Sequence, residues 1–153
     1  MAALVYAGTT LLRIPSPTGG YTHLGDAFVL LSGWLLGPWW GMAAAGMGSA
    51  LAELIGYPLY ILPSLLIKGA MGFLSGWILK KAGSRFGSLA GGIAAELWMC
   101  VGYFLVAALI FGKGTAALAS VPGNLLQGGV GILLGLTLFR ILKKALKEEF
   151  PEA

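Results

Sequence analysis

Long apolar segments with almost no charge dominate the sequence. Between Ser88 and Phe111, for example, Glu96 is the only charged residue. A helix needs about 20 mostly apolar residues to cross the hydrocarbon core of a bilayer, so this segment is long enough to span it. Only 10% of the whole chain is charged, whereas about a quarter of the residues of a typical soluble domain are. We therefore expect a polytopic membrane protein, with residues 1–153 forming a single integral membrane domain.

Prolines and glycines divide the apolar sequence into helices. Pro15 and Pro17 cannot continue a helix, and Gly37-Pro38 interrupts the next apolar run. The expected fold class is all-α, a bundle of six transmembrane helices. These helices are expected at about residues 2–13, 26–37, 39–55, 61–80, 86–111 and 122–146.

The basic residues predict an orientation in the membrane. If six spans alternate from a cytoplasmic N-terminus, the outer side receives only Arg13 and Lys113, and Lys68 lies within the membrane. The cytoplasmic side then receives Lys80, Lys81, Arg85, Arg140, Lys143, Lys144 and Lys147. Cytoplasmic loops carry an excess of lysine and arginine, so both termini are expected in the cytoplasm of a prokaryotic cell, with the protein crossing the plasma membrane several times.

Several other classes of site are not expected. The net charge of +4 is attributed to this topology and not to nucleic-acid binding. Cys100 is the only cysteine and is expected to be a small packing residue, and His23 beside a single aspartate is a poor metal site. The sequence has no P-loop and no recognisable nucleophile or zinc motif, so we expect no cofactor and no enzyme activity.

A short polar stretch, residues 18–26, separates the first two expected helices. Gly19 and Gly20 allow a tight turn, and Tyr21, His23 and Asp26 follow as side chains that can recognise a ligand. Asp26 alone also fits a cap of the following helix. The stretch as a whole is interpreted as a lid over a binding site.

Further polar and aromatic residues fall on the same, outer side of the expected bundle. Charges within a membrane are costly and usually face a partner or a cavity. Lys68 is therefore expected to pair with Glu53 or Glu96, which does not exclude ligand binding, while Trp34 is expected to face lipid. The candidate site residues outside the loop are Glu53, Tyr57, Tyr60, Lys68, Glu96, Met99, Tyr103, Asn124 and Gln127.

The first expected helix carries small residues on one face. Ala3, Ala7 and Gly8 lie at spacings that place them together, and such a face allows another helix to approach closely.

Several motifs of the first half resemble a known family. They are Gly-Gly-Tyr-Thr-His-Leu-Gly-Asp26, Val29-Leu-Leu-Ser-Gly-Trp-Leu-Leu-Gly-Pro38, Gly46-Met-Gly-Ser-Ala-Leu-Ala-Glu53, Gly56-Tyr-Pro-Leu-Tyr60 and Ile67-Lys-Gly69. They look like the substrate-binding S components of energy-coupling factor (ECF) vitamin transporters, of the riboflavin type and closest to its pyridoxine and hydroxymethylpyrimidine members. The resemblance implies that the chain captures a vitamin, that Ala3 and Ala7 dock on a transmembrane T component, and that two cytoplasmic ATPases drive uptake.

Three functions follow as hypotheses. The first is the binding subunit for a small flat vitamin or precursor that resembles pyridoxine or hydroxymethylpyrimidine, with another vitamin such as riboflavin as the alternative. The second is a membrane enzyme with Glu53, Glu96 or His23 as acid or base. The third is an assembly subunit without a ligand, which the outer polar residues argue against.

Overall fold

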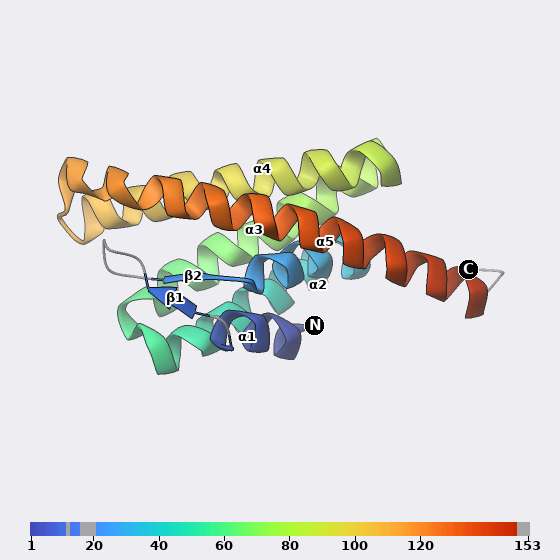
Figure 1. Cartoon of the computed structure of the whole chain (residues 1–153), viewed down its shortest axis with the longest axis horizontal. Coiled ribbons are helices and arrows are strands. Elements are labelled where there is room, and N and C mark those ends of the chain that lie inside the picture. The colour runs from blue at the N-terminus through green and yellow to red at the C-terminus, as the bar shows by residue number, and fades with distance from the viewer. Residues whose placement is uncertain (12, 16–20, 150–153) are drawn as a thin grey trace.

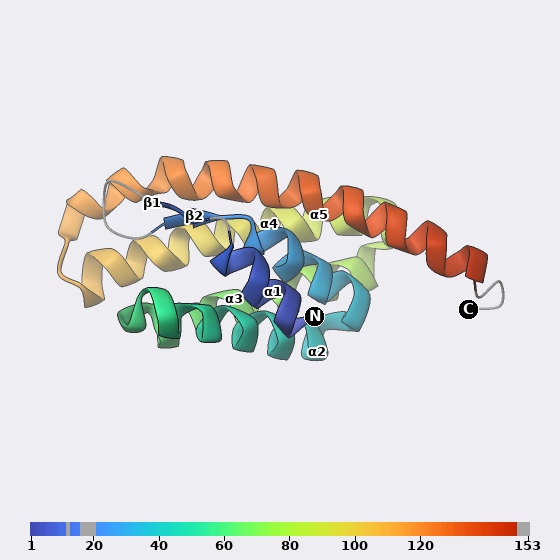
Figure 2. The same cartoon turned by 60° about the horizontal axis from the view of Figure 1, so that its bottom comes forward.

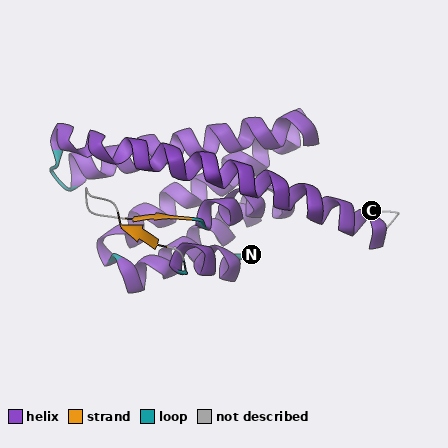
Figure 3. Ribbon diagram, in the orientation of Figure 1, coloured by secondary structure: helices purple, strands orange, loops and turns teal. Residues whose placement is uncertain are grey.

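The computed structural model describes residues 1–11, 13–15 and 21–149. Its helices and strands are α1 (Ala2–Thr10), β1 (Arg13–Pro15), β2 (Tyr21–His23), α2 (Gly25–Gly56), α3 (Ile61–Ala82), α4 (Ser84–Leu105) and α5 (Val121–Glu149). Three short helical turns join them: η1 (Pro58–Tyr60), the π-helical η2 (Val106–Ile110) and η3 (Gly114–Ser120). Figure 3 shows that the described chain is helical apart from one small pair of strands and a few short loops.

Helix α2 folds back on itself at Gly37, which has φ 79° and ψ 179°. Ser32 Oγ donates a hydrogen bond to the carbonyl oxygen of Gly41 across this bend, at 3.1 Å. The segments expected at 26–37 and 39–55 are therefore the two arms of one element, and the described residues form five α-helices where six were expected. Glycine suits the positive φ, and Pro38 follows it without needing a backbone donor.

The chain between α1 and α2 differs from the expectation. Helix α1 ends at Thr10, so the helix expected over 2–13 is too long. Arg13–Pro15 instead pairs with Tyr21–His23 in an antiparallel hairpin, with Arg13 opposite His23. The Arg13 guanidinium donates to the carbonyl oxygens of Thr9 and Ala52, which ties the hairpin to α1 and to the end of α2.

Four helical segments are long and apolar enough to cross a membrane. They are Gly25–Gly56, Pro58–Ala82, Phe86–Ile110 and Gly114–Ala145. Figures 1 and 2 place the hairpin, the α2–α3 connection and the α4–α5 connection at one end of the bundle. The α3–α4 connection lies at the opposite end, where α5 continues beyond the other helices. The end that carries the hairpin is called the hairpin end below.

Close approach of backbones holds α2, α3 and α4 together. A Cβ atom on Gly33 would lie 2.3 Å from the carbonyl oxygen of Gly72, and one on Gly76 would lie 2.6 Å from the carbonyl oxygen of Gly33. Neither position has room for a side chain, because backbone atoms fill it. In a bilayer, where lipid is as apolar as leucine, such close packing is a main source of helix association.

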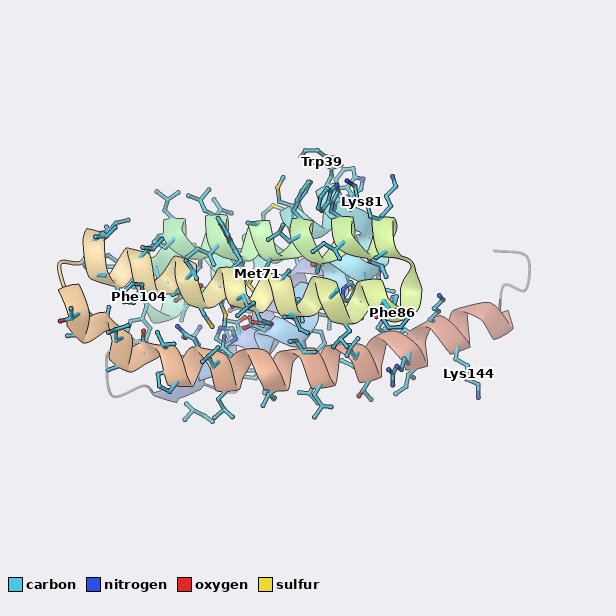
Figure 4. The ribbon with its side chains drawn as sticks, turned by 90° about the horizontal axis from the view of Figure 1, so that it is seen from above. Trp39, Met71, Lys81, Phe86, Phe104 and Lys144 are labelled. Atoms are coloured by element: carbon cyan, nitrogen blue, oxygen red, sulfur yellow. The ribbon has the colours of Figure 1, made fainter. Side chains whose placement is uncertain are left out.

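The tryptophans divide between the core and the surface. Trp34 was expected to face lipid, but it is 5% exposed and its ring packs 5.5 Å from Phe139 of α5. The prediction failed because α5 covers this part of α2, which sequence spacing does not show. Figure 4 shows Trp39 at one edge of the bundle near Lys81, at the end away from the hairpin. Trp39 is exposed, as expected of a side chain at a membrane interface.

Candidate functional site

A fully buried ion pair lies in the interior of the bundle, toward the hairpin end. Lys68 of α3 pairs with Oδ1 of Asp26, in the first turn of α2, and both side chains are at most 1% exposed. The expected partners of Lys68 were Glu53 and Glu96, and both expectations are wrong. Asp26 was also considered as a helix cap, but its two oxygens accept from Lys68 and Gln127. Tertiary packing selected this partner, since α2 and α3 have the most extensive contact in the molecule.

Gln127 connects this ion pair to the hairpin. Its side-chain nitrogen donates to Oδ2 of Asp26 at 2.7 Å, and its side-chain oxygen accepts from the backbone N–H of His23 at 3.0 Å. Gln127 is 4% exposed, and both ends of its amide are occupied. The amide therefore joins α5, α2 and β2 in one buried network.

His23 lies at the start of α2 as a neutral side chain. Its Nδ1 accepts a hydrogen bond from the backbone N–H of Gly25 at 3.0 Å, which requires Nδ1 to be unprotonated. Burial lowers the pKa of His23 to about 4, against the opposing effect of Asp26 and with smaller lowering effects of Lys68 and Arg13. His23 therefore adds no positive charge to the site at neutral pH.

Glu96 of α4 lies beside the ion pair, and Asp26 and Lys68 are the charged groups that act on it. Two glycines of α5 leave room for these carboxylates. A Cβ on Gly131 would lie 2.9 Å from Cβ of Asp26 and 3.1 Å from Oε1 of Glu96, and one on Gly128 would lie 3.0 Å from Oε2 of Glu96. We call the buried set Asp26, Lys68, Glu96, Met99 and Gln127 the central polar cluster.

Met99 and Tyr103 complete the surroundings of Lys68 on the α4 side. Nζ of Lys68 is 3.0 Å from Sδ of Met99 and 5.5 Å from the centre of the Tyr103 ring. These contacts place two α4 residues, one turn apart, against the lysine. A sulfur and an aromatic face are weak acceptors that suit a buried ammonium group.

A second polar group lies next to the central polar cluster. Ser64 Oγ donates to Oε1 of Glu53 at 3.2 Å and is 2.8 Å from the Tyr103 hydroxyl. A serine has one hydroxyl proton, so the Tyr103 hydroxyl donates to Ser64. Glu53 is 6% exposed, so this chain of hydrogen bonds keeps its carboxylate in a polar setting. Tyr103 touches both groups and joins them.

The remaining expected site residues lie closer to the surface. Tyr60 is partly buried, with its ring 6.0 Å from that of Tyr103 and 5.0 Å from that of Phe111. Tyr57 is 40% exposed, and Asn124 is half-buried one turn of α5 before Gln127. The side chain of Tyr21 lies outside what the structure describes.

Sequence reasoning missed three kinds of contributing residue. Ser64 lies one helical turn before Lys68, and this spacing on a shared face was a usable signal. Gly128 follows Gln127 directly and Gly131 lies one helical turn after it, and glycines beside a polar residue in a transmembrane helix indicate a close approach. Phe111 was included in a helix but not in the site, and nothing in its local sequence marks its contact with Tyr60.

Comparison with known proteins gives two matches. Residues 1–144 match the family described as the S component of the ECF-type riboflavin transporter. The chain is also 40% identical over 137 residues to an uncharacterized protein of Pyrococcus woesei, a match that covers 89% of this chain and 92% of the relative. The buried polar cluster, the four apolar helices and the match over nearly the whole length agree, and the chain belongs to the family of S components of ECF-type riboflavin transporters.

Proposed function

We propose that this S component binds a small, flat, hydroxylated heteroaromatic vitamin or vitamin precursor, of the pyridoxine or hydroxymethylpyrimidine kind. The observation that carries the proposal is the central polar cluster, where five buried residues from four helices converge next to two tyrosine rings. Ionisable groups inside a membrane are costly and rare, and they mark substrate and ion pathways, so a functional site is the default hypothesis for them. An S component is a transport subunit, so we assign these groups to binding and not to catalysis.

The composition of the site supports a compact ligand without phosphate. Lys68 is the only cation in the central polar cluster and is already paired with Asp26. A phosphorylated or carboxylated ligand would bring more negative charge to a site that already contains Asp26 and Glu96. Tyr60, Tyr103 and Phe111 offer aromatic faces for a flat ring, and such contacts contribute about 1 kcal/mol beyond burial.

Riboflavin is the second candidate, because the family description names it. Its large ring system would need space beyond the central polar cluster. The second polar group, Glu53 with Ser64 and Tyr103, is the neighbouring part of the molecule that offers hydrogen bonds to such a ligand.

A panel of vitamins tests the proposal directly. The detergent-solubilised protein should unfold at a higher temperature with a vitamin of the pyridoxine or hydroxymethylpyrimidine kind, since a ligand that binds only the native state stabilises it. The phosphorylated forms of the same vitamins are the matched control and should give a smaller shift. Native mass spectrometry of the mixture identifies the bound compound. If no member of the panel binds, the proposed function is wrong.

We also infer how the subunit works with its partners. The hairpin end is the outer, substrate-receiving side, both termini are cytoplasmic, and residues 1–153 form one integral membrane domain. Ala3 is exposed and Ala7 half-buried on α1, which leaves this face accessible to the T component of a module driven by two ATPases. Gly8, expected on the same face, instead packs against α2, where a Cβ atom would lie 2.6 Å from the Phe28 ring.

A further inference from the structure

Glu96 differs from the other charged residues of the central polar cluster. Lys68 and Asp26 form an ion pair, and Gln127 donates a hydrogen bond to Asp26. In the part of the chain that the structure describes, no group donates a hydrogen bond to either carboxyl oxygen of Glu96, although the side chain is only 5% exposed. Its hydrogen-bonding neighbour is the Asp26 carboxyl, which already accepts from Lys68 and Gln127. Buried polar atoms in native proteins nearly always have a partner. The site therefore lacks the donors that these two oxygens require.

The acidic groups of the cluster outnumber its cations. Lys68 is the one cation of the cluster, whereas Asp26 and Glu96 are both acids. His23 does not change this, because its pKa is lowered to about 4 and its Nδ1 already accepts from Gly25. A buried carboxyl group is paired, binds a cation or gives up its charge. A protonated ligand with hydrogen-bond donors would supply the partner that Glu96 lacks.

Two glycines of α5 pack against the two carboxyl oxygens of Glu96. A Cβ atom on Gly128 would lie 3.0 Å from Oε2 of Glu96, and one on Gly131 would lie 3.1 Å from Oε1. An alanine at either position would crowd the carboxyl group. The two glycines thus let α5 approach the Glu96 carboxyl group closely and place no side chain of their own beside its two oxygens.

We propose that Glu96 is the specificity-determining residue and that it binds the amidine-like edge of an aminated heteroaromatic ring. Such an edge consists of the N–H of a protonated ring nitrogen and the neighbouring exocyclic amino group. Its two parallel donors match a carboxylate as the guanidinium group of arginine does. The inference rests on the proposed function and narrows it to rings such as aminopyrimidines. Pyridoxine has no ring amino group, so we expect it to bind more weakly than an aminopyrimidine.

Two matched probes test this assignment. One is hydroxymethylpyrimidine with its ring amino group, and the other is the counterpart in which an oxo group replaces the amino group. The wild-type protein should bind the amino compound at least about tenfold more tightly in isothermal titration, because a hydrogen bond to a charged group is worth about that factor or more. The oxo group would turn an acceptor toward the carboxylate. Equal affinities for the two probes would overturn the assignment.

The variant Glu96→Leu supplies the second arm. It removes both oxygens at similar volume and should lose the preference for the amino compound. Its unfolding temperature without ligand should equal or exceed that of the wild type, since it removes a buried group without partners. Trp98→Phe is the control, because Trp98 is 46% exposed on the same helix and should keep the preference. If the Glu96→Leu protein still prefers the amino compound over the oxo compound, the proposal is wrong. If that variant does not fold, the affinities of the wild-type protein for the two probes decide the question.

The outcomes separate this inference from the proposed function. If riboflavin or pyridoxine raises the unfolding temperature but the amino and oxo probes bind equally, the protein is a vitamin-binding subunit and Glu96 does not read an amidine-like edge. If no vitamin and neither probe binds, both proposals fail.

Discussion

At the scale of single residues, the Lys68–Asp26 pair decides how the centre of the protein is built. Forty-two positions separate the two residues in sequence, and no local spacing joins them. The sequence predicted that Lys68 needs an acidic partner, because an unpaired ammonium in a membrane is costly. It did not predict which acid, because the choice among Asp26, Glu53 and Glu96 depends on how α2 and α4 are rotated against α3.

Removing one member of this pair should harm the fold more than removing both charges. Lys68→Met leaves Asp26 buried without its cation, which should lower the free energy of unfolding by about 3–5 kcal/mol. The double variant Lys68→Met with Asp26→Asn keeps an acceptor for Gln127 and should recover most of this loss. Thermal unfolding in detergent measures both. A double variant less stable than the single one would show that the pair is not the stabilising unit.

His23 predicts a pH dependence of stability. The pKa of His23 is about 4 in the folded protein, whereas the ordinary value, which applies to the unfolded chain, is 6.5. Between these two pH values the unfolded chain therefore binds more protons than the folded protein. Stability should therefore fall as the pH is lowered from about 6.5 to about 4, and the contribution of this one group is about 3 kcal/mol. His23→Asn retains an acceptor for Gly25 but does not titrate, so its stability should change less over this range. Identical pH profiles for the two proteins would contradict the assignment.

At the scale of elements, the sequence predicted the helical regions better than their ends. The apolar runs that became α3, α4 and α5 were visible because each contains few charges over about 20 residues. The hairpin was not expected, since strands of three residues show no usable alternation. The break at Gly37-Pro38 was predicted, and the alternation of the expected spans implied a reversal there, but nothing in the sequence showed that Ser32 would lie against Gly41.

The glycines of α5 provide a test of how closely this helix approaches the site. Gly131→Ala places a methyl group against Asp26 and Glu96 and should cost about 1–3 kcal/mol of stability, as overpacking does, and weaken ligand binding. Gly129→Ala is the matched control, because a Cβ there meets nothing within 4 Å. Alanine favours helix by about 1 kcal/mol over glycine, so this control should be equally or more stable. If the two variants have the same unfolding temperature and the same ligand affinity, α5 does not approach Asp26 and Glu96 this closely.

At the scale of the whole molecule, the buried polar residues and the exposed basic residues are separated along the bundle. The central polar cluster and the tyrosine rings lie toward the hairpin end, and the exposed basic residues Lys80, Lys81, Arg140 and Lys143 lie toward the other. Figure 4 shows Lys144 on the part of α5 that extends past its neighbours. Such a division suits a subunit that receives a ligand on one side and meets its partners elsewhere. The sequence predicted this division from the distribution of charge, although not the contacts within the site.

The exposed face of α1 should matter for transport and not for binding. Ala3→Leu adds bulk where a helix of the T component is expected to approach, so uptake of the vitamin by cells should be lost while ligand affinity in detergent stays unchanged. Ala90→Leu is the control, because Ala90 is exposed on α4 and away from this face. Loss of affinity together with transport would show that Ala3 serves the protein's own packing.

The orientation in the membrane can be tested with single cysteines. Cys100 is buried and can be replaced by alanine, which leaves a background without thiols. Thr115→Cys, in η3 at the hairpin end, and Ala145→Cys, near the end of α5, then introduce one exposed position at each end. An impermeant maleimide should label Thr115→Cys in intact cells and Ala145→Cys only after the membrane is permeabilised, because basic flanks are retained in the cytoplasm. The reverse pattern would place the central polar cluster nearer the cytoplasm and would exclude capture of the vitamin from outside the cell.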